Sequence, residues 1–296
     1  MSDLLEKQYE LGGVRFGTGS PVEILADGFT ISSAAARTQD VDNPTGDGVR
    51  FGRDYKGSAT WGFSMYSNAS NEEEAWDFVR PLATAWDAEE TRLNSGAVVP
   101  LRYKLAGQTR IVYGRPRRWS AVYTNALMGG RIDIEADFAT VDDRSYSDVE
   151  NSVPISLLPP TDPTVGVVAP FLVPFSSGPG SSVRQSSIYI GGDTPTPIWL
   201  TFVGEIDDAF VRAGDYWTAG LPDRVNEGNP VTIDARPWVR AATQSTGGGV
   251  RVNPRLTRIS KMYLPPGYHE LTFTGTDRIG NATALVGWRD AYKTPR

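Results

Sequence analysis

The chain lacks cysteine, has a single histidine, His269, and contains no long apolar run. Without cysteine there is no disulfide framework, thiolate metal site or thiol nucleophile. One histidine excludes multi-histidine metal sites and makes any Ser-His-Asp triad depend on His269. No stretch approaches the length of about 18 apolar residues that a membrane-spanning helix needs, and the first residues show no signal-peptide pattern. We therefore expect a soluble chain without metal, cofactor or membrane segment, cytosolic at synthesis.

The glycine and proline content and the length of the chain predict how it divides into turns and domains. The 31 glycines and 21 prolines among 296 residues suit many tight turns. At this length single hydrophobic cores give way to two domains. Prolines are dense in one stretch, at positions 154, 159, 160, 163, 170, 174 and 179. We predict a first domain over residues 1–150, a Pro-rich linker over 151–182, and a second domain over 183–296.

Charge is unevenly distributed between the two halves. Residues 1–150 carry 16 Lys and Arg against 23 Asp and Glu, whereas residues 151–296 carry 13 against 12. The net charge of −6 therefore arises from an acidic first half. This distribution argues against specific nucleic-acid binding there, because binding to phosphates needs a surplus of cations.

One amphipathic helix is predicted, over residues 70–93. Ala75, Val79, Leu82 and Trp86 recur at helical spacing, so we expect them to pack on a sheet. Ser70 and Glu73 fit a capping box at its start. Pro81 predicts a kink or a break near Arg80.

The rest of the first half is predicted to be short strands. Asp27-Gly28 indicates a hairpin between residues 22–25 and 29–31, and the polar residues 32–48 indicate a long loop. Alternating strands are expected over 58–66 and, after the helix, over 98–105, 109–113, 118–123 and 131–138. The predicted fold of this half is a curled antiparallel sheet whose core is closed by one packed helix.

The strand over residues 131–138 places three carboxylates on one face. Asp133, Glu135 and Asp137 alternate with Ile132, Ile134, Ala136 and Phe138. Like charges in such a row favour a face that is solvated or meets cations. A solvated face is the leading interpretation, and a metal-ligand set is the weaker one.

The second half is predicted to be a β-sandwich with a jelly-roll-like arrangement. Its strand candidates are residues 187–190, 197–203, 229–234, 238–239, 261–264, 268–274 and 282–288, with turn residues between them.

The order of these patterns resembles the distal tail protein family, or minor tail proteins, of long-tailed phages. The first half has a Tyr-Glu-Leu strand, the Asp-Gly turn, the long loop, an aromatic strand and an acid-capped helix. The second half contributes the more specific motifs, GGDTPTP at 191–197, VTIDARP at 231–237, LPPGYHELTFTG at 264–275 and ALVGWRDAY at 284–292. These motifs cover nearly the whole chain.

The resemblance implies a structural virion protein at the tail tip, assembled in the host cytoplasm. Its first domain, a β-barrel or sandwich with one packed helix, would form a six-fold ring at the end of the tail tube, through which DNA passes. Its second domain, a sandwich that is galectin-like in shape, would project outward. The implied partners are further copies of the chain, the tail tube protein, the baseplate hub or tail-lysin protein and, during assembly, the tape-measure protein. A host-surface glycan is a partner only under the alternative function considered next. In such a ring, Asp133, Glu135 and Asp137 are our candidates for the channel wall, where they would repel phosphates.

Two other functions compete with this interpretation. A carbohydrate-binding second domain would use exposed aromatic side chains, for which Tyr216 and Trp217 are the best candidates. A glycan-cleaving enzyme would need two carboxylates facing one another across a cleft, whereas Asp142-Asp143 and Asp207-Asp208 have the pattern of turn residues. We therefore expect no enzymatic activity, and we expect His269 to be an ordinary strand histidine.

Overall fold

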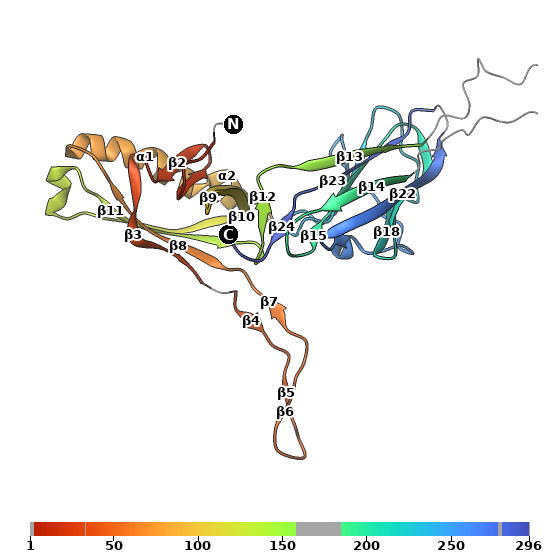
Figure 1. The fold of residues 1–296 in the computed structure, drawn as a ribbon, viewed down its shortest axis with the longest axis horizontal. Coiled ribbons are helices and arrows are strands. Elements are labelled where there is room, and N and C mark those ends of the chain that lie inside the picture. Colours follow the sequence, from red (N-terminus) through yellow and green to blue (C-terminus); the bar gives the residue numbers. More distant parts are fainter. Residues whose placement is uncertain (1–2, 33, 158–184, 278–279, 296) are drawn as a thin grey trace, which may run out of the picture. The chain divides into compact units, whose positions relative to one another are not determined.

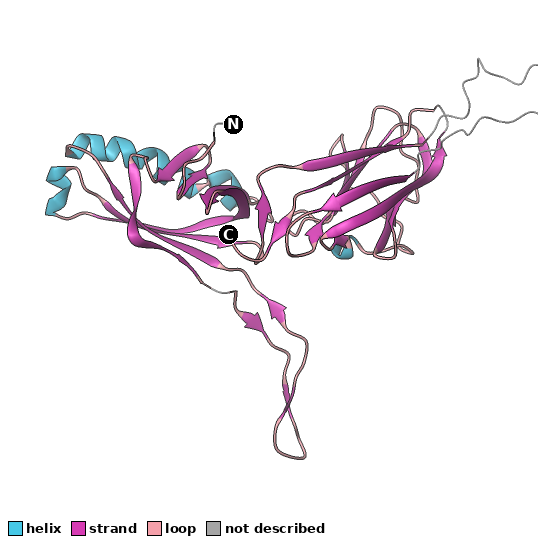
Figure 2. Ribbon diagram, viewed as in Figure 1, coloured by secondary structure: helices cyan, strands magenta, loops and turns pink. Residues whose placement is uncertain are grey.

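The computed structural model describes residues 3–32, 34–157, 185–277 and 280–295, and these residues are mainly β. They divide into two compact units (Figures 1 and 2). Unit 1 comprises residues 1–148 together with 292–296, and unit 2 comprises 149–291. The expectation of a mainly β fold with a packed helix in the first half and a sandwich in the second is confirmed.

Unit 1 is built on one large antiparallel sheet. Its strands follow the order β2-β1-β9-β10-β11-β8-β3, so the sheet is open between β2 and β3 and does not close into a barrel. Their bounds are β1 Gln8–Leu11, β2 Val14–Gly17, β3 Val22–Ile31, β8 Thr60–Ser67, β9 Val99–Leu105, β10 Gln108–Val122 and β11 Asp133–Thr140. The short strands β12 (Ser145–Ser147) and β24 (Ala291–Tyr292) pair beside β10. A 3-10 helix, η1 (Asn125–Gly129), follows β10.

Helix α1 (Glu72–Asp87) covers one face of this sheet (Figure 1). The four residues predicted for its inner face, Ala75, Val79, Leu82 and Trp86, are all buried. Trp86 packs edge-on against Phe16 and Phe63, and its indole N–H donates to the Asp137 carbonyl at 3.3 Å. Helix α1 therefore covers the hydrophobic core of unit 1.

The ends of α1 differ from the sequence prediction. Asn71, not Ser70, is the N-cap, and its side chain accepts from the Glu74 N–H at 3.0 Å. The helix also continues through Pro81, so of the kink or break predicted near Arg80 the break is wrong. Pro81 has no N–H group to bond the carbonyl oxygen one turn earlier in the helix. Because Pro81 lies on the exposed side of α1, water can bond that oxygen instead. The break comes instead at Ala88, in the left-handed region at φ 41°, before the short helix α2 (Glu89–Leu93).

Asp27-Gly28 does not form the predicted hairpin, because β3 runs through it as one strand. The pairing of β3 with β8 shifts register between Ile24 and Phe29, so the dipeptide lies in a bulge. A side chain at Gly28 would come within 2.3 Å of the Ser64 carbonyl oxygen. This close approach of two backbones, rather than a turn, is what requires the glycine. Likewise β10 is continuous where two strands are predicted around Gly114.

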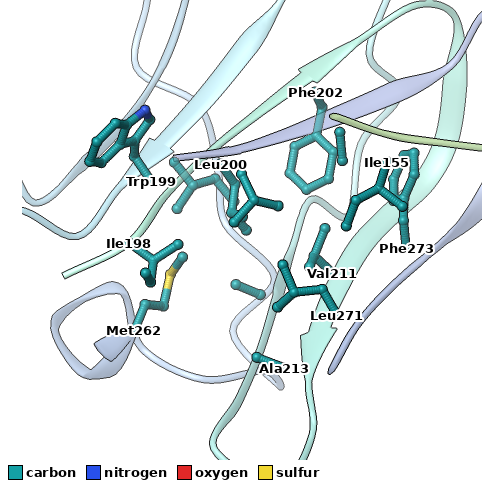
Figure 3. Packing of buried hydrophobic residues seen from close by; sticks show 14 of the residues in the cluster. Ile155, Ile198, Trp199, Leu200, Phe202, Val211, Ala213, Met262, Leu271 and Phe273 are labelled. Atoms are coloured by element: carbon teal, nitrogen blue, oxygen red, sulfur yellow. The ribbon is translucent and has the colours of Figure 1, made fainter. Parts of the chain in front are cut away.

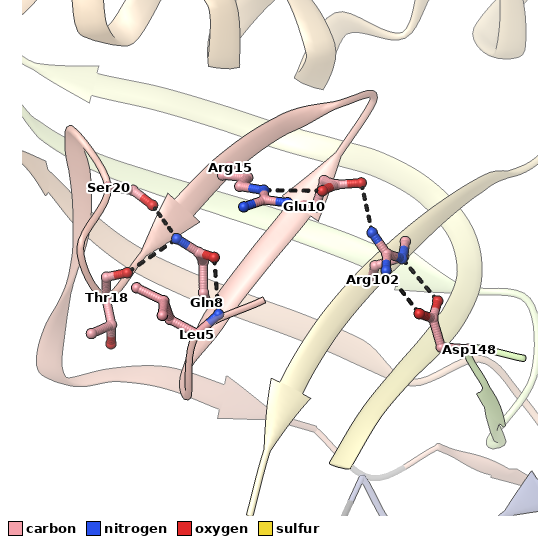
Figure 4. Close-up of polar contacts among 8 residues, drawn as sticks. All are labelled: Leu5, Gln8, Glu10, Arg15, Thr18, Ser20, Arg102 and Asp148. Atoms are coloured by element: carbon pink, nitrogen blue, oxygen red, sulfur yellow. Dashed lines mark hydrogen bonds and ion pairs between the residues drawn. The ribbon is translucent and has the colours of Figure 1, made fainter. Parts of the chain in front are cut away.

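A polar cluster holds the first strand of unit 1 (Figure 4). Arg102 forms a two-pronged ion pair with Asp148, at 2.8 and 2.7 Å, and a third bond to Glu10 at 3.0 Å. Arg15 pairs with the same Glu10 at 3.2 Å. Nearby, the Gln8 side chain bonds the Ser20 hydroxyl and the Thr18 carbonyl. These contacts join β1, β2, β9 and the last residues of the unit's main segment.

The predicted loop over residues 32–48 is the first half of a long hairpin arm, residues 34–57. Two short ladders build it, β4 (Ala36–Arg37) with β7 (Tyr55–Lys56), and β5 (Val41–Asp42) with β6 (Val49–Arg50). The arm extends from the ends of β3 and β8 away from the unit 1 sheet (Figure 1).

Unit 2 is a sandwich of a five-stranded sheet, β13-β23-β16-β19-β20, and a four-stranded sheet, β14-β22-β17-β18. The bounds of the first sheet are β13 Asn151–Ser156, β23 Thr283–Trp288, β16 Trp199–Val203, β19 Val231–Asp234 and β20 Ala241–Gln244. Those of the second are β14 Gln185–Ile190, β22 Gly267–Asp277, β17 Ile206–Ala213 and β18 Trp217–Gly220. Two further strands, β15 (Thr196–Pro197) and β21 (Tyr263–Leu264), pair with one another, and the 3-10 helix η2 (Ile259–Lys261) precedes β21. Apolar side chains from both sheets, among them Phe202 and Phe273, interdigitate in the core (Figure 3).

The segment predicted as a linker, residues 151–182, begins with a strand. Asn151–Ser156 form β13, which pairs along its whole length with β23, and Ile155 is buried in the unit 2 core. The prolines of this segment do not prevent the pairing, because β13 is an edge strand and can leave the nitrogen of Pro154 unpaired. Residues 158–182 of the segment lie outside the described residues.

Candidate functional site

The face of the unit 1 sheet opposite α1 is polar. On β11 the side chains of Ile134, Ala136 and Phe138 are buried beneath α1, so Asp133, Glu135 and Asp137 occupy the other face. The strands on either side extend this face with small and polar residues. Ser64 of β8 and Ser120 of β10 lie directly opposite Glu135. The predicted alternation is therefore present, and we call this surface the carboxylate face.

Two of the three carboxylates are paired with arginines that the sequence prediction does not include. Arg118 contacts Glu135 at 2.6 Å, and Arg131 contacts Asp133 at 2.9 Å. Arg118 comes from the β10 bulge between Pro116 and Trp119, where the register with β11 shifts. Such a bulge cannot be read from the sequence, whereas Arg131, two residues before Asp133, is a visible signal. All four side chains are more than a third exposed, so each pair contributes little stability.

A second polar contact continues the carboxylate face onto β3. The Tyr66 hydroxyl donates to Glu23 at 2.8 Å, and this bond raises the pKa of Tyr66 above its ordinary value. The guanidinium of Arg131 lies 5.0 Å from the centre of the Tyr66 ring. Asp137, in contrast, forms no ion pair with any described residue and lies opposite Gly62. At this end of the face the neighbouring strand has no side chain to meet the carboxylate.

The carboxylate face does not gather its acids into a compact group. Residues two apart along a strand are separated by about 6.6 Å, which is too wide for three carboxylates to share one ion. Among the residues that the structure describes, no group of three His, Cys, Asp or Glu could hold a metal ion. No helix in the described residues is long and apolar enough to cross a membrane.

The hairpin arm exposes apolar side chains that its own fold does not cover. Phe51 is 85% exposed and Val41 64%, and Val49 and Tyr55 are also exposed. The sequence carries a signal for this arm that the loop prediction misses. Val41 and Val49 flank the turn-rich residues 43–48, a pattern typical of a hairpin.

The base of the arm is held to the body of unit 1. The Ser32 hydroxyl exchanges hydrogen bonds with the backbone of Thr60, and Lys56 forms an ion pair with Asp143 at 2.7 Å. Burial raises the pKa of the neighbouring Asp142, against the opposing effect of the hydrogen bond from the Tyr146 hydroxyl. The arm is therefore fixed at its base and exposed along its length.

In unit 2 the two predicted glycan-contact residues, Tyr216 and Trp217, differ in their exposure to solvent. Trp217 is only 2% exposed and belongs to the core, because β18 turns its side chain toward the opposite sheet. It is therefore excluded as a sugar-stacking residue. Tyr216, in the turn before β18, is 57% exposed and packs edge-on against His269, with ring centres 5.1 Å apart. His269 is mostly buried, and its Nε2 lies 2.7 Å from the Pro265 carbonyl oxygen.

The adjacent aspartates considered for catalysis are engaged in local contacts. Asp142 accepts from the Tyr146 hydroxyl at 2.6 Å, and Asp143 binds Lys56. In the other pair, Asp207 binds Arg224 at 2.8 Å. Asp208 occupies the β17 bulge at φ 50°. Local contacts thus account for Asp142, Asp143 and Asp207, and the backbone bulge accounts for the position of Asp208.

Comparison with solved structures finds the same fold over nearly the whole chain. The structure of SPP1 Dit (gp 19.1), described as a hub adsorption apparatus of phages that infect Gram-positive bacteria, aligns with a TM-score of 0.53 and 11% identity. The alignment covers 96% of this chain and 98% of that one. A chain of the phage P2 baseplate in its activated conformation with calcium aligns with a TM-score of 0.53 and 12% identity, covering 96% and 97%. The same baseplate with strontium gives 0.51 and 12%, covering 95% and 97%. No protein-family model and no curated protein matches the sequence.

Proposed function

We propose that this chain is a structural subunit of the distal tail of a long-tailed phage, at the hub that joins the tail tube to the baseplate. The observation that carries the proposal is the extent of the fold similarity. The alignments cover 96% of this chain and 98% or 97% of the SPP1 Dit and baseplate chains, so they include residues of both units. At such low identity this likeness shows the fold alone, so the function is inferred from the surfaces that the fold presents.

Two surfaces of unit 1 favour assembly into a ring. The apolar arm contributes little to the core of its own chain, so burying its side chains against another subunit would be favourable. The unit 1 sheet also leaves two edges, β2 and β3, available for pairing. We propose that six copies associate through these elements, and that unit 2 forms a separate outer domain.

The carboxylate face is then proposed as the wall of the ring's channel. Its side chains are mostly small or polar, with Val122 opposite Asp133 as an exposed apolar exception, and Asp137 remains without an ion pair among the described residues. Such a surface does not hold phosphates, so DNA can pass along it. In this arrangement the partners are the tail tube protein, the baseplate hub or tail-lysin protein and, during assembly in the host cytoplasm, the tape-measure protein. The role requires no enzymatic activity and no cofactor.

Ring formation is the direct test of this function. We expect the purified chain to form hexameric rings by mass photometry and negative-stain electron microscopy. Replacing residues 38–54 with Asn-Gly shortens the arm to the ladder between β4 and β7, so the monomer should still fold, with an unchanged melting temperature. The shortened chain should no longer form rings.

A milder substitution controls for the shortened arm. Phe51→Ser removes the most exposed apolar side chain of the arm and leaves both ladders in place. It should weaken ring formation in proportion to the apolar area lost, with no change in melting temperature. A parent chain that stays monomeric up to tens of micromolar concentration, or a shortened chain that forms rings as well as the parent, would contradict the proposal.

A further inference from the structure

The outer face of the four-stranded sheet in unit 2 carries two exposed tyrosines side by side. Tyr189 of β14 and Tyr268 of β22 lie directly opposite one another in the antiparallel register. Their exposed fractions are 59% and 80%, and their ring centres are 4.9 Å apart at an interplanar angle of 54°. Two aromatic rings therefore stand next to one another on a solvent-facing sheet, with little covering them among the described residues.

Tyr216 lies at the same end of this sheet. The register places Ala213, the last residue of β17, opposite Leu271, so the turn that follows β17 lies beside the first residues of β22. The contact between Tyr216 and His269 fixes this position. His269 directly follows Tyr268 in β22, so its buried side chain and the Tyr216 ring that contacts it do not belong to the outer face. The exposed pair on the outer face is therefore Tyr189 and Tyr268, and we call these two residues the tyrosine platform.

Polar groups continue the same face next to the platform. Alternation along β22 places Glu270 and Thr272 on the side of Tyr268, and Ser187 of β14 lies opposite Glu270. Glu270 is exposed and forms no ion pair with any described residue. It lies two residues from Tyr268, about 6.6 Å along the strand. A ring stacked on the platform can therefore present its hydroxyl groups to a carboxylate and a serine.

The charges beside the platform decide which ligand suits it. Arg212, the cation on the neighbouring β17, is engaged by Asp215 at 3.1 Å and by the Gly214 carbonyl oxygen at 2.8 Å. The uncompensated charge on this part of the described face is thus the Glu270 carboxylate, which repels sulfated or phosphorylated ligands. A neutral sugar fits better, because its polarised C–H groups are attracted to the electron-rich face of a tyrosine ring. Its adjacent hydroxyls donate well to a carboxylate.

We propose that the tyrosine platform, with Glu270 beside it, binds a neutral oligosaccharide. The proposal does not depend on ring assembly by unit 1, since every contributing residue belongs to unit 2. The plainer alternative is that Tyr189 and Tyr268 form a cross-strand pair that stabilises the edge strand β14. That role explains the contact between the two rings but does not explain why Tyr268 remains 80% exposed.

Saturation-transfer NMR on the full-length chain tests the proposal. The probes are cellotetraose, maltotetraose, chitotetraose and galactotetraose, with a heparin tetrasaccharide as the anionic comparison. At least one neutral probe should receive saturation at its ring protons, and heparin should receive none. Tyr268→Thr and Tyr189→Thr keep strand propensity but remove the ring, so each should weaken binding about tenfold.

Matched variants separate binding from folding. Tyr268→Phe retains the ring and should bind nearly as well as the parent. Tyr123→Thr removes a tyrosine of similar exposure, 58%, from unit 1 and should leave binding unchanged. Glu270→Gln should weaken binding without changing the melting temperature. The proposal is overturned if no neutral probe receives saturation, if heparin binds better than every neutral probe, or if Tyr268→Thr and Tyr189→Thr both bind like the parent. If the parent binds no sugar and the Tyr268→Thr and Tyr189→Thr variants have lower melting temperatures than the parent, the cross-strand role is established instead.

Discussion

At the scale of single residues, Arg102 is the side chain on which the polar framework of unit 1 depends most. Its side chain is only 8% exposed and is held by Asp148 and Glu10. The hydrogen bonds to Asp148 hold the pKa of Arg102 above its ordinary value, so the charge persists despite burial. Removing the guanidinium would take the two-pronged ion pair away from the partly buried Asp148 and would leave Glu10 with the more exposed Arg15.

Arg102→Ala should therefore lower the free energy of unfolding of unit 1 by about 3 kcal/mol, as expected when one partner of a buried ion pair is removed. Arg15→Ala is the matched control, because Arg15 binds the same Glu10 but is more exposed. Its cost should stay below about 1 kcal/mol. Urea unfolding of both variants measures the difference. Equal stability of the two would show that the burial of Arg102 has no energetic consequence.

Residue-level predictions from the sequence succeed where periodicity decides them. Helical spacing places Trp86 in the core, and strand spacing gives the alternation of Asp133, Glu135 and Asp137. Such predictions fail where a tertiary contact decides the outcome. Trp217 has the same turn-rich surroundings as Tyr216, and only the packing of β18 on the opposite sheet buries it. The pairing of Tyr268 with Tyr189 is equally invisible in sequence, because the register of β14 with β22 brings together distant segments.

At the scale of elements, strand boundaries are the least predictable feature, because bulges look like turns in sequence. Asp27-Gly28 has the composition of a hairpin, yet β3 continues through it with a shifted register. Propensity favours a turn at this dipeptide, but the pairing of β3 with β8 outweighs it. The helix shows the same conflict, since Pro81 predicts a break and the packing of Leu82 and Trp86 holds α1 together.

The bulge in β3 gives a testable prediction. Gly28→Ala places a Cβ within 2.3 Å of the Ser64 carbonyl oxygen, a backbone atom that cannot move without disturbing β8. We expect a loss of about 2 kcal/mol in the free energy of unfolding, as for other overpacked sites. Gly129→Ala is the control, since a Cβ added there would meet nothing within 4 Å, and it should change stability by less than about 0.5 kcal/mol. Thermal unfolding of both variants distinguishes the close approach from a general preference for glycine in turns. If Gly28→Ala is as stable as the parent, the bulge tolerates a side chain.

At the scale of the whole molecule, charge and architecture combine in unit 1. The acidic surplus of the first half is visible in the sequence, but its distribution over the sheet is not. The structure shows that arginines compensate Asp133 and Glu135, and that Asp137 has no ion pair among the described residues. The carboxylate face is therefore less repulsive than three free carboxylates would be. Within a ring, such a surface would keep phosphates from binding without forming a strong electrostatic barrier.

Charge reversal on this face tests its proposed place in the channel. Replacing Asp133, Glu135 and Asp137 with lysine leaves the buried side of β11 unchanged, so the chain should fold and assemble as the parent does. The three lysines would join Arg118 and Arg131, and repetition around the ring would create a cationic wall. We expect the assembled variant to bind double-stranded DNA at low salt and to release it as salt rises, because the interaction is screened over about 8 Å at physiological ionic strength. The parent should not bind.

The control for this experiment must carry the same change in net charge at another place. Glu73, Glu89 and Glu90 are exposed near the starts of α1 and α2, and α1 lies on the opposite face of the sheet from the carboxylates. Replacing these three with lysine should give much weaker DNA binding, since the added cations would not line the channel. Fluorescence anisotropy with a short labelled duplex compares the two variants across a salt series, after negative-stain imaging has confirmed rings in both. Equal binding by both variants would mean that net charge alone attracts DNA, and rings of the first variant that ignore DNA at low salt would place the carboxylate face outside the channel.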